Sequence, residues 1–210
     1  MLETQGNNKL SHTNATFKAL NDTVIPQPLK KQGQMQSADV LEHSIDAYQA
    51  WTLNHSLSPI VFKLVLNIYL AKPTAKMLDA AARQLIKNNG HKEPVNPVIL
   101  NEAGGAFAAL APSDRLRALS LLEQLKVSPS SLPFPFLINS GLVLSVTGTL
   151  IMLTTIGYYS GWTGYGSTSL EAPEKRTIEG FPASWKQAGY PGPAKGYHGF
   201  RGYLIDKFTE

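Results

Sequence analysis

The chain has 210 residues, enough to bury a hydrophobic core, and it carries a net charge of +4 with only 16% charged residues. It contains no cysteine, which excludes a disulfide framework, an iron–sulfur cluster, Cys-attached haem and Cys-ligated zinc. The N-terminus, MLETQGNNKLSHTN, has neither the apolar stretch nor the twin arginines of an export signal. We therefore expect a cytoplasmic chain, or one whose signal was removed or lies on a partner.

Two helices are expected in the first quarter of the chain. Thr13 or Asn14 is a suitable N-cap for the first, whose apolar side is Phe17, Leu20 and Val24, and Pro26 ends it. Ser37 would cap the second. The apolar side of the second helix is formed by Leu41, Ile45, Tyr48 and Trp51.

Three further helices are expected before Val127. Residues 58–70 are apolar on nearly every face, which favours a central helix surrounded by others. Pro73 and Thr74 open the next helix, and Asn88, Asn89 and Gly90 close it. The inward residues of that helix would be Met77, Ala81 and Leu85 or Ile86. Ser113 begins the last helix, with Leu116, Leu119, Leu122 and Leu125 as its buried stripe.

Residues 127–170 contain no charged residue and no histidine. Within them, residues 137–158 are long enough to cross a bilayer, which needs roughly 20 apolar residues. Seven Asn, Ser and Thr residues and the lack of flanking Lys or Arg favour a helix buried in protein instead. Gly141, Ser145 and Thr149 lie four apart and form a face that another backbone can approach closely. We predict a buried helix, with the single membrane span as the alternative.

The last quarter of the chain has a different composition. Ten of the 17 glycines and eleven aromatic residues lie between Gly157 and Phe208. Such a stretch cannot form a regular helix, and it has too many rings for a flexible linker. We therefore predict a mainly α fold, with an irregular helical domain of about five to six helices over residues 1–156 and an extended Gly/Pro/aromatic-rich arm over residues 157–210. Aromatic residues dominate interface hot spots, so the arm would bind a partner. Its contact residues would be Tyr158, Tyr159, Trp162, Tyr165, Trp185, Tyr190, Pro191, Tyr197 and Phe200.

Motifs for catalysis or cofactor binding are missing from the sequence. There is no Gly-x-Ser-x-Gly elbow, Walker loop, His-Glu-x-x-His or strand-linked Gly-x-Gly-x-x-Gly. The five histidines lack the spacing of metal ligands and are expected to be surface or capping residues. The segment Gly196–Tyr203 resembles arms that stack on single-stranded nucleic acid, but it has one arginine where such arms have many. We predict no catalytic, cofactor or metal site on this chain, and nucleic-acid binding is the weaker alternative.

Two stretches of the chain resemble the gluconate 2-dehydrogenase subunit 3 family. The first is FKALNDTVIP, from Phe17 to Pro26, which is similar to that family's opening helix and its closing Ile-Pro. The second is TTIGYYSGWTGYG, from Thr154 to Gly166, followed by WKQAGYPG from Trp185 to Gly192. The order and rough spacing of these motifs hold over nearly the whole chain.

The resemblance implies a large partner subunit of the glucose-methanol-choline oxidoreductase type, which carries FAD and is often accompanied by a cytochrome electron acceptor. The small subunit of that family holds no cofactor and supports the folding and, commonly, the export of the large one. The family's usual twin-arginine signal is absent here. On this basis we expect a non-catalytic small subunit of a sugar or alcohol dehydrogenase. A small single-span membrane-anchored protein remains the alternative from another class.

Overall fold

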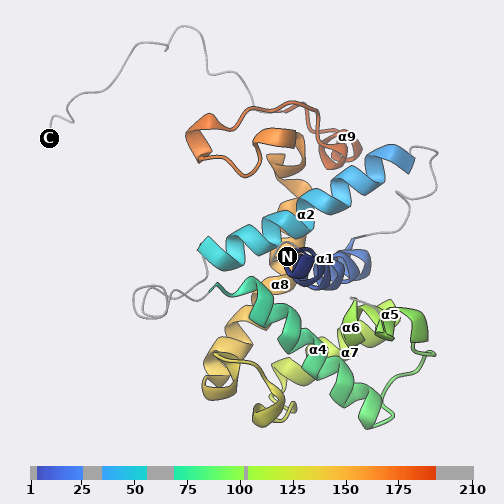
Figure 1. Ribbon diagram of the computed structural model, residues 1–210. Helices are drawn as coiled ribbons and strands as arrows, with labels where there is room; N and C mark the ends of the chain where they lie inside the picture. The colour runs from blue at the N-terminus through green and yellow to red at the C-terminus, as the bar shows by residue number, and fades with distance from the viewer. Residues whose placement is uncertain (1–3, 26–34, 56–68, 102–103, 193–210) are drawn as a thin grey trace, which may run out of the picture.

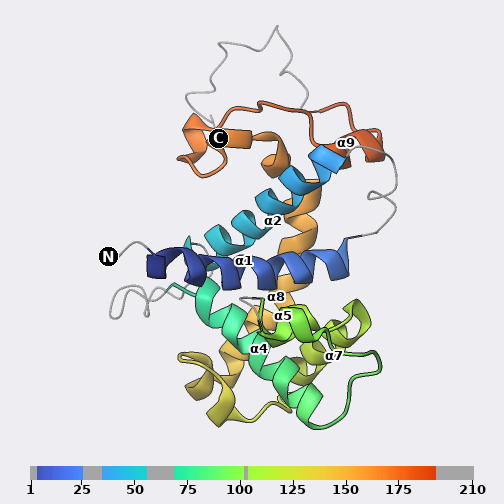
Figure 2. The same cartoon turned by 45° about the vertical axis from the view of Figure 1, so that its right-hand side comes forward.

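A computed structural model describes residues 4–25, 35–55, 69–101 and 104–192 of the chain. The described residues form eight α-helices and several short 3-10 turns, with no strand among them, which confirms the predicted mainly α fold. Figures 1 and 2 show α8 (Ser140–Tyr159) running through the molecule behind α1 and α2. At one end of α8 lie α4 and α7, and at the other lie the C-terminal turns and α9 (Ala183–Ala188).

The first two helices are longer than the sequence pattern indicates. α1 spans Thr4–Val24, so Thr13 and Asn14 lie inside it and the predicted N-cap is wrong. Its apolar stripe is nevertheless correct at Phe17 and Leu20, which are fully buried. α2 spans Met35–His55, which places Ser37 in its first turn. Ile45 of α2 is buried and Tyr48 packs against the core, as expected, whereas the side chain of Leu41 lies outside the described residues.

The helix expected after Pro73 is α4, which spans Ala71–Lys87. Pro73 falls in its first turn, where a missing backbone N–H costs nothing. Met77, Ala81 and Leu85 are buried, as predicted. Asn89 has a φ of 50°, and the N–H of Gly90 donates to the carbonyl of Leu85 at 2.9 Å, which is the expected left-handed C-terminal cap. The helix expected over 58–70 lies almost wholly outside the described residues.

Two helices of five residues each were not predicted, because they are too short to show a hydrophobic period. They are α5 (Pro97–Asn101) and α6 (Gly105–Ala109). α7 spans Pro112–Glu123, close to the predicted start at Ser113. Its predicted stripe is half wrong, because Leu116 and Leu125 are exposed. The buried residues of α7 are Asp114, Arg115, Ala118, Leu119 and Leu122.

Arg115 is buried because its guanidinium group replaces water with main-chain acceptors. It donates to the carbonyls of Ala19 at 2.9 Å and Ala108 at 3.0 Å, which joins α7 to α1 and α6. Burial lowers the pKa of Arg115, and the nearby Asp22 opposes that shift. The sequence pattern assigned only apolar residues to the inner face of α7, whereas the buried Arg115 belongs to that face and Leu116 does not.

The predicted C-terminal arm is not extended over its described part. After α8 the chain makes three 3-10 turns, η4 (Gly161–Gly164), η5 (Gly166–Thr168) and η6 (Pro173–Lys175), and then forms α9. η4 contacts α2 and α8, and α9 contacts α8. Residues 157–192 therefore fold back onto the helical domain.

Candidate docking surface

α8 has one face in the hydrophobic core. Asn139 caps the helix, because its side-chain oxygen accepts the N–H of Leu142 at 2.9 Å, so α8 begins later than the predicted residue 137. The helix contacts α1, α2 and α7. The inner face of α8 consists of Leu142, Val143, Val146, Thr147, Leu150, Leu153, Thr154, Gly157 and Tyr158.

Polar contacts fix how α8 packs against its neighbours. The amide of Gln49 on α2 donates to the hydroxyl of Thr154 at 2.6 Å in a buried contact. A Cβ at Gly157 would lie 2.9 Å from the Tyr48 ring, so glycine lets α2 approach closely here. The Tyr158 hydroxyl donates to the side chain of Gln187 at 2.7 Å. Burial, and then the neighbouring Tyr159, raise the pKa of Tyr158.

The opposite side of α8, which we call the outer face, is exposed and has no charge. It comprises Gly141, Leu144, Ser145, Gly148, Ile151, Met152, Thr155, Ile156 and Tyr159. Five large side chains there, Leu144, Ile151, Met152, Ile156 and Tyr159, are each between 40% and 52% exposed. α8 is therefore buried within this chain on one side only, and burial of the outer face in a complex stays a prediction. α8 is also the one described helix that is long and apolar enough to cross a membrane.

The N-terminal half of the outer face carries mostly small residues, so the helix backbone there lies close to the surface. Gly141 and Ser145 are exposed, and a Cβ added at Gly148 would meet nothing within 4 Å. Thr149 donates its hydroxyl to the carbonyl of Ser145, and Thr155 donates to that of Ile151, so their hydrogen-bonding needs are met inside the helix. The small-residue face that the sequence indicates is thus available to another backbone.

Trp162 was expected to contact a partner, but it packs inside this chain and is 3% exposed. Its ring centroid lies 4.9 Å from that of Tyr48 and 6.0 Å from that of Trp51, both on α2. The Arg176 guanidinium lies over both tryptophan rings, 5.0 Å from Trp51 and 5.1 Å from Trp162, in cation–π geometry. These contacts hold the C-terminal segment on α2.

Trp185 was also expected at the partner interface and is likewise buried in this chain. Its indole N–H donates to the carbonyl of Tyr159 at 3.0 Å. Phe181 and Tyr190 meet its ring edge-on, with centroids 5.6 and 5.0 Å away. The glycines nearby serve packing, because a Cβ at Gly164 would lie 2.6 Å from the carbonyl oxygen of Gly180.

The predicted contact residues therefore separate into three groups. Tyr158, Trp162 and Trp185 are buried, so their side chains make their contacts within this chain. Tyr159, Tyr190 and Pro191 are exposed, and Tyr165 is half-buried. Tyr197 and Phe200 lie outside the described residues. Sequence reasoning missed Leu144, Ile151, Met152 and Ile156, although the absence of charge over residues 127–170 is the signal that marks them.

Among the described residues, no group of three or more His, Asp or Glu side chains could hold a metal ion. His12 is nevertheless not an isolated surface residue, because its Nε2 lies 2.9 Å from the carboxylate of Asp79. The two residues are 67 positions apart, so no local spacing could have indicated the pair. Asp79 also accepts the N–H of Phe107 at 2.9 Å, which ties α1, α4 and α6 together.

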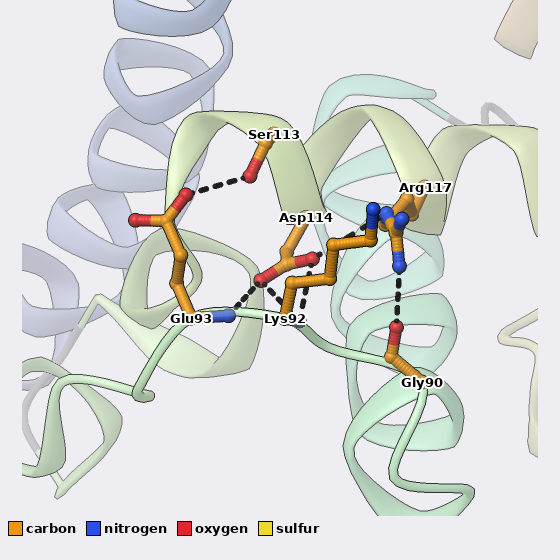
Figure 3. Close-up of polar contacts among 6 residues, drawn as sticks. All are labelled: Gly90, Lys92, Glu93, Ser113, Asp114 and Arg117. Carbon is orange, nitrogen blue, oxygen red and sulfur yellow. Dashed lines mark hydrogen bonds and ion pairs between the residues drawn. The ribbon is translucent and has the colours of Figure 1, made fainter.

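A second buried carboxylate, on α7, organises the loop between α4 and α5 (Figure 3). Asp114 accepts the backbone N–H groups of Lys92 and Glu93, each at 3.0 Å, and lies 3.7 Å from Arg117. Burial alone would raise the pKa of Asp114, but these hydrogen bonds, Arg117 and His91 together lower it. The cluster is structural, because its donors and acceptors satisfy one another.

The chain matches no protein-family model, no curated protein and no solved structure. The resemblance drawn from the sequence motifs stays a prediction.

Proposed function

We propose that this chain is the non-catalytic small subunit of a FAD-dependent sugar or alcohol dehydrogenase, and that it binds the large subunit through the outer face of α8. The observation that carries the proposal is the exposure of that charge-free, apolar face. The largest apolar patch on a monomeric protein is typically about 300–600 Å² and is often functional, so this face is the first candidate for a binding surface.

The size of the outer face suits one part of a protein interface. A helix of 20 residues is about 30 Å long, and one side of it is about 10 Å wide, which gives roughly 300 Å². A standard interface buries about 800 Å² on each partner, so α8 would supply about a third. Tyr190 and Pro191 are exposed beyond its C-terminal end and offer further contact area.

The choice of partner rests on the order of the motifs. The match to the family's opening helix includes Phe17 and Leu20, which are in the core. The first part of the second stretch, Thr154 to Gly166, contains the C-terminal end of α8 and η4. Its second part, Trp185 to Gly192, contains most of α9. The motifs therefore belong to the packing that holds α8 in place and turns its outer face toward solvent.

A membrane is the second candidate occupant, because α8 meets the length and apolarity of a span. Two observations favour a protein partner. A span would have to withdraw the inner face of α8 from the core and break the Gln49–Thr154 hydrogen bond. The outer face also includes Ser145 and Thr155, and it lacks the flanking basic residues typical of a membrane edge.

Affinity purification of the full chain from its native cells tests the proposal. We expect a large flavoprotein to copurify with unchanged chain and with Val98→Asp, which alters an exposed apolar residue on α5. The double variant Ile151→Asp/Met152→Asp, which places two charges on the outer face, should lose it. Retention of the flavoprotein by the double variant contradicts the proposed surface, and absence of any flavoprotein contradicts the proposed function. If the unchanged chain stays in the membrane pellet after a high-pH wash, the membrane span is correct instead.

A further inference from the structure

A polar cleft lies between α4 and the turn that follows α7. It has a volume of about 890 Å³ and is bordered by His12 of α1, by one side of α4 and by residues 128–133. From the cleft we infer a second binding site, for a small molecule that carries two or more phosphate or carboxylate groups. The inference goes beyond the proposed function and does not rest on it.

The wall of the cleft is fixed by the protein itself. The side chain of Gln84 donates to the carbonyl of Lys126 at 2.6 Å and accepts the N–H of Ser128 at 3.0 Å. The Ser131 hydroxyl donates to the carbonyl of Ser128 at 2.7 Å. These bonds hold the turn against α4, so a ligand would meet a preformed site and not have to order it.

Among the described residues that line the cleft, Asp79 is the one acidic residue. The Asp79 carboxylate is buried and already accepts hydrogen bonds from Phe107 and pairs with His12. Gly105 has a φ of +74°, and a Cβ there would overlap that carboxylate, so glycine is needed for this arrangement. The Asp79 carboxylate thus has hydrogen-bonding partners within the protein, and the Arg83 guanidinium lies 3.7 Å away.

The rim of the cleft is basic. Lys76, Arg83 and Lys87 all border it. Arg83 and Lys87 follow Lys76 by seven and eleven residues on α4, which places the three within about 40° of one another around the helix axis. Arg83 lies 3.7 Å from Asp79 but is 73% exposed, so its guanidinium group remains accessible. The net charge of the lining is therefore positive even before His12 is considered.

The length of this basic row indicates the class of ligand. Lys76 and Lys87 are separated by roughly 16 Å along the axis, at 1.5 Å per residue. A single phosphate can contact one or two of these basic side chains, whereas a molecule with several anionic groups can contact all three. Ser130 and Asn88 also border the cleft and offer neutral hydrogen-bonding groups. A row of lysines alone is commonly a solvated helix face. Here it faces a hollow whose walls are fixed.

Calorimetric titration of the full chain in a non-ionic detergent, at low salt, tests the site. The probes are inorganic phosphate, pyrophosphate, citrate and the acidic peptide tetraglutamate. We expect pyrophosphate and citrate to bind with one site per chain, at least tenfold more tightly than phosphate. Arg83→Gln/Lys87→Gln should weaken pyrophosphate at least tenfold. The matched control, Lys175→Gln/Lys186→Gln, removes two exposed charges at the other end of the molecule and should change binding by less than twofold (Figure 1).

Three results would overturn the inference. The first is the absence of binding by either polyanion at millimolar concentration. The second is equal weakening by both double variants, which would indicate attraction to the net charge of the chain and not a site. The third is binding only by an acidic peptide such as tetraglutamate, which would assign the cleft to a protein partner. Circular dichroism of each variant confirms that the fold is intact.

Discussion

Replacing Trp162 by alanine tests whether the C-terminal segment belongs to this chain's core. Trp162 is buried against Tyr48, Trp51 and Arg176. Truncating a buried tryptophan costs about 3–5 kcal/mol, since it removes apolar contact and leaves a cavity. The free energy of unfolding of a native protein is about 5–15 kcal/mol, so this loss is a large fraction of it. We expect the melting temperature to fall by roughly 6–20 °C.

The assay is urea and thermal unfolding followed by far-ultraviolet circular dichroism, at a concentration low enough to prevent self-association. Tyr159→Ala is the control, because that ring is 52% exposed and contacts only the edge of Tyr158 among the described rings. It should cost about 1 kcal/mol, the usual contribution of one aromatic pair. If the free energies of unfolding of Trp162→Ala and Tyr159→Ala differ by less than about 1 kcal/mol, and Trp162→Ala no longer binds the partner, the Trp162 ring belongs to an interface and its packing in the core is wrong.

Three further predictions concern stability and self-association. Asp114→Asn should destabilise the fold by about 1–3 kcal/mol at pH 7, because two backbone N–H groups lose a charged acceptor. Because the folded protein lowers the pKa of Asp114, the ionised carboxylate stabilises the fold at pH values above its ordinary pKa near 4, and this stabilisation is lost as the pH falls through the pKa of the folded state. The free energies of unfolding of the two proteins should therefore converge below pH 4, and a constant difference between them would contradict this. Gly105→Ala should cost about 2 kcal/mol from its positive φ, with further loss from displacing Asp79, and a neutral result in urea unfolding would show that α6 adjusts freely. The purified chain should self-associate in sedimentation velocity, and Ile151→Asp/Met152→Asp should restore a monomer, because the outer face is the apolar contact; a monomeric unchanged chain would refute that explanation.

Local sequence signals predicted the helices well where a hydrophobic period coincides with a cap. α4 is the clearest case, because Pro73 and the Asn-Asn-Gly ending leave few alternatives. α7 shows the limit of the method, since its inner face includes Arg115, whose acceptors come from α1 and α6. Only tertiary structure can make a buried arginine favourable.

The candidate site was predicted in part. The charge-free segment identified α8, but composition gives no direction, and a helix that is apolar all round does not show which side is covered. The aromatic residues after Gly157 were assigned to a partner because rings are common at interfaces. Trp162 instead packs against Tyr48 and Trp51 of α2, with Arg176 over its ring. Trp185 donates to the carbonyl of Tyr159 at the end of α8.

The absence of cysteine allows the central claim to be tested directly, because one introduced thiol is the only one in the chain. Met152→Cys places a thiol on the outer face, and Val98→Cys places one on α5, where the native side chain is 61% exposed. The measurement is the rate of maleimide labelling of each variant, alone and in the complex purified from native cells. We predict that maleimide labels Met152→Cys at least tenfold more slowly in the complex than in the free chain, and that it labels Val98→Cys at the same rate in both. Equal labelling of Met152→Cys in the two states would contradict docking through α8.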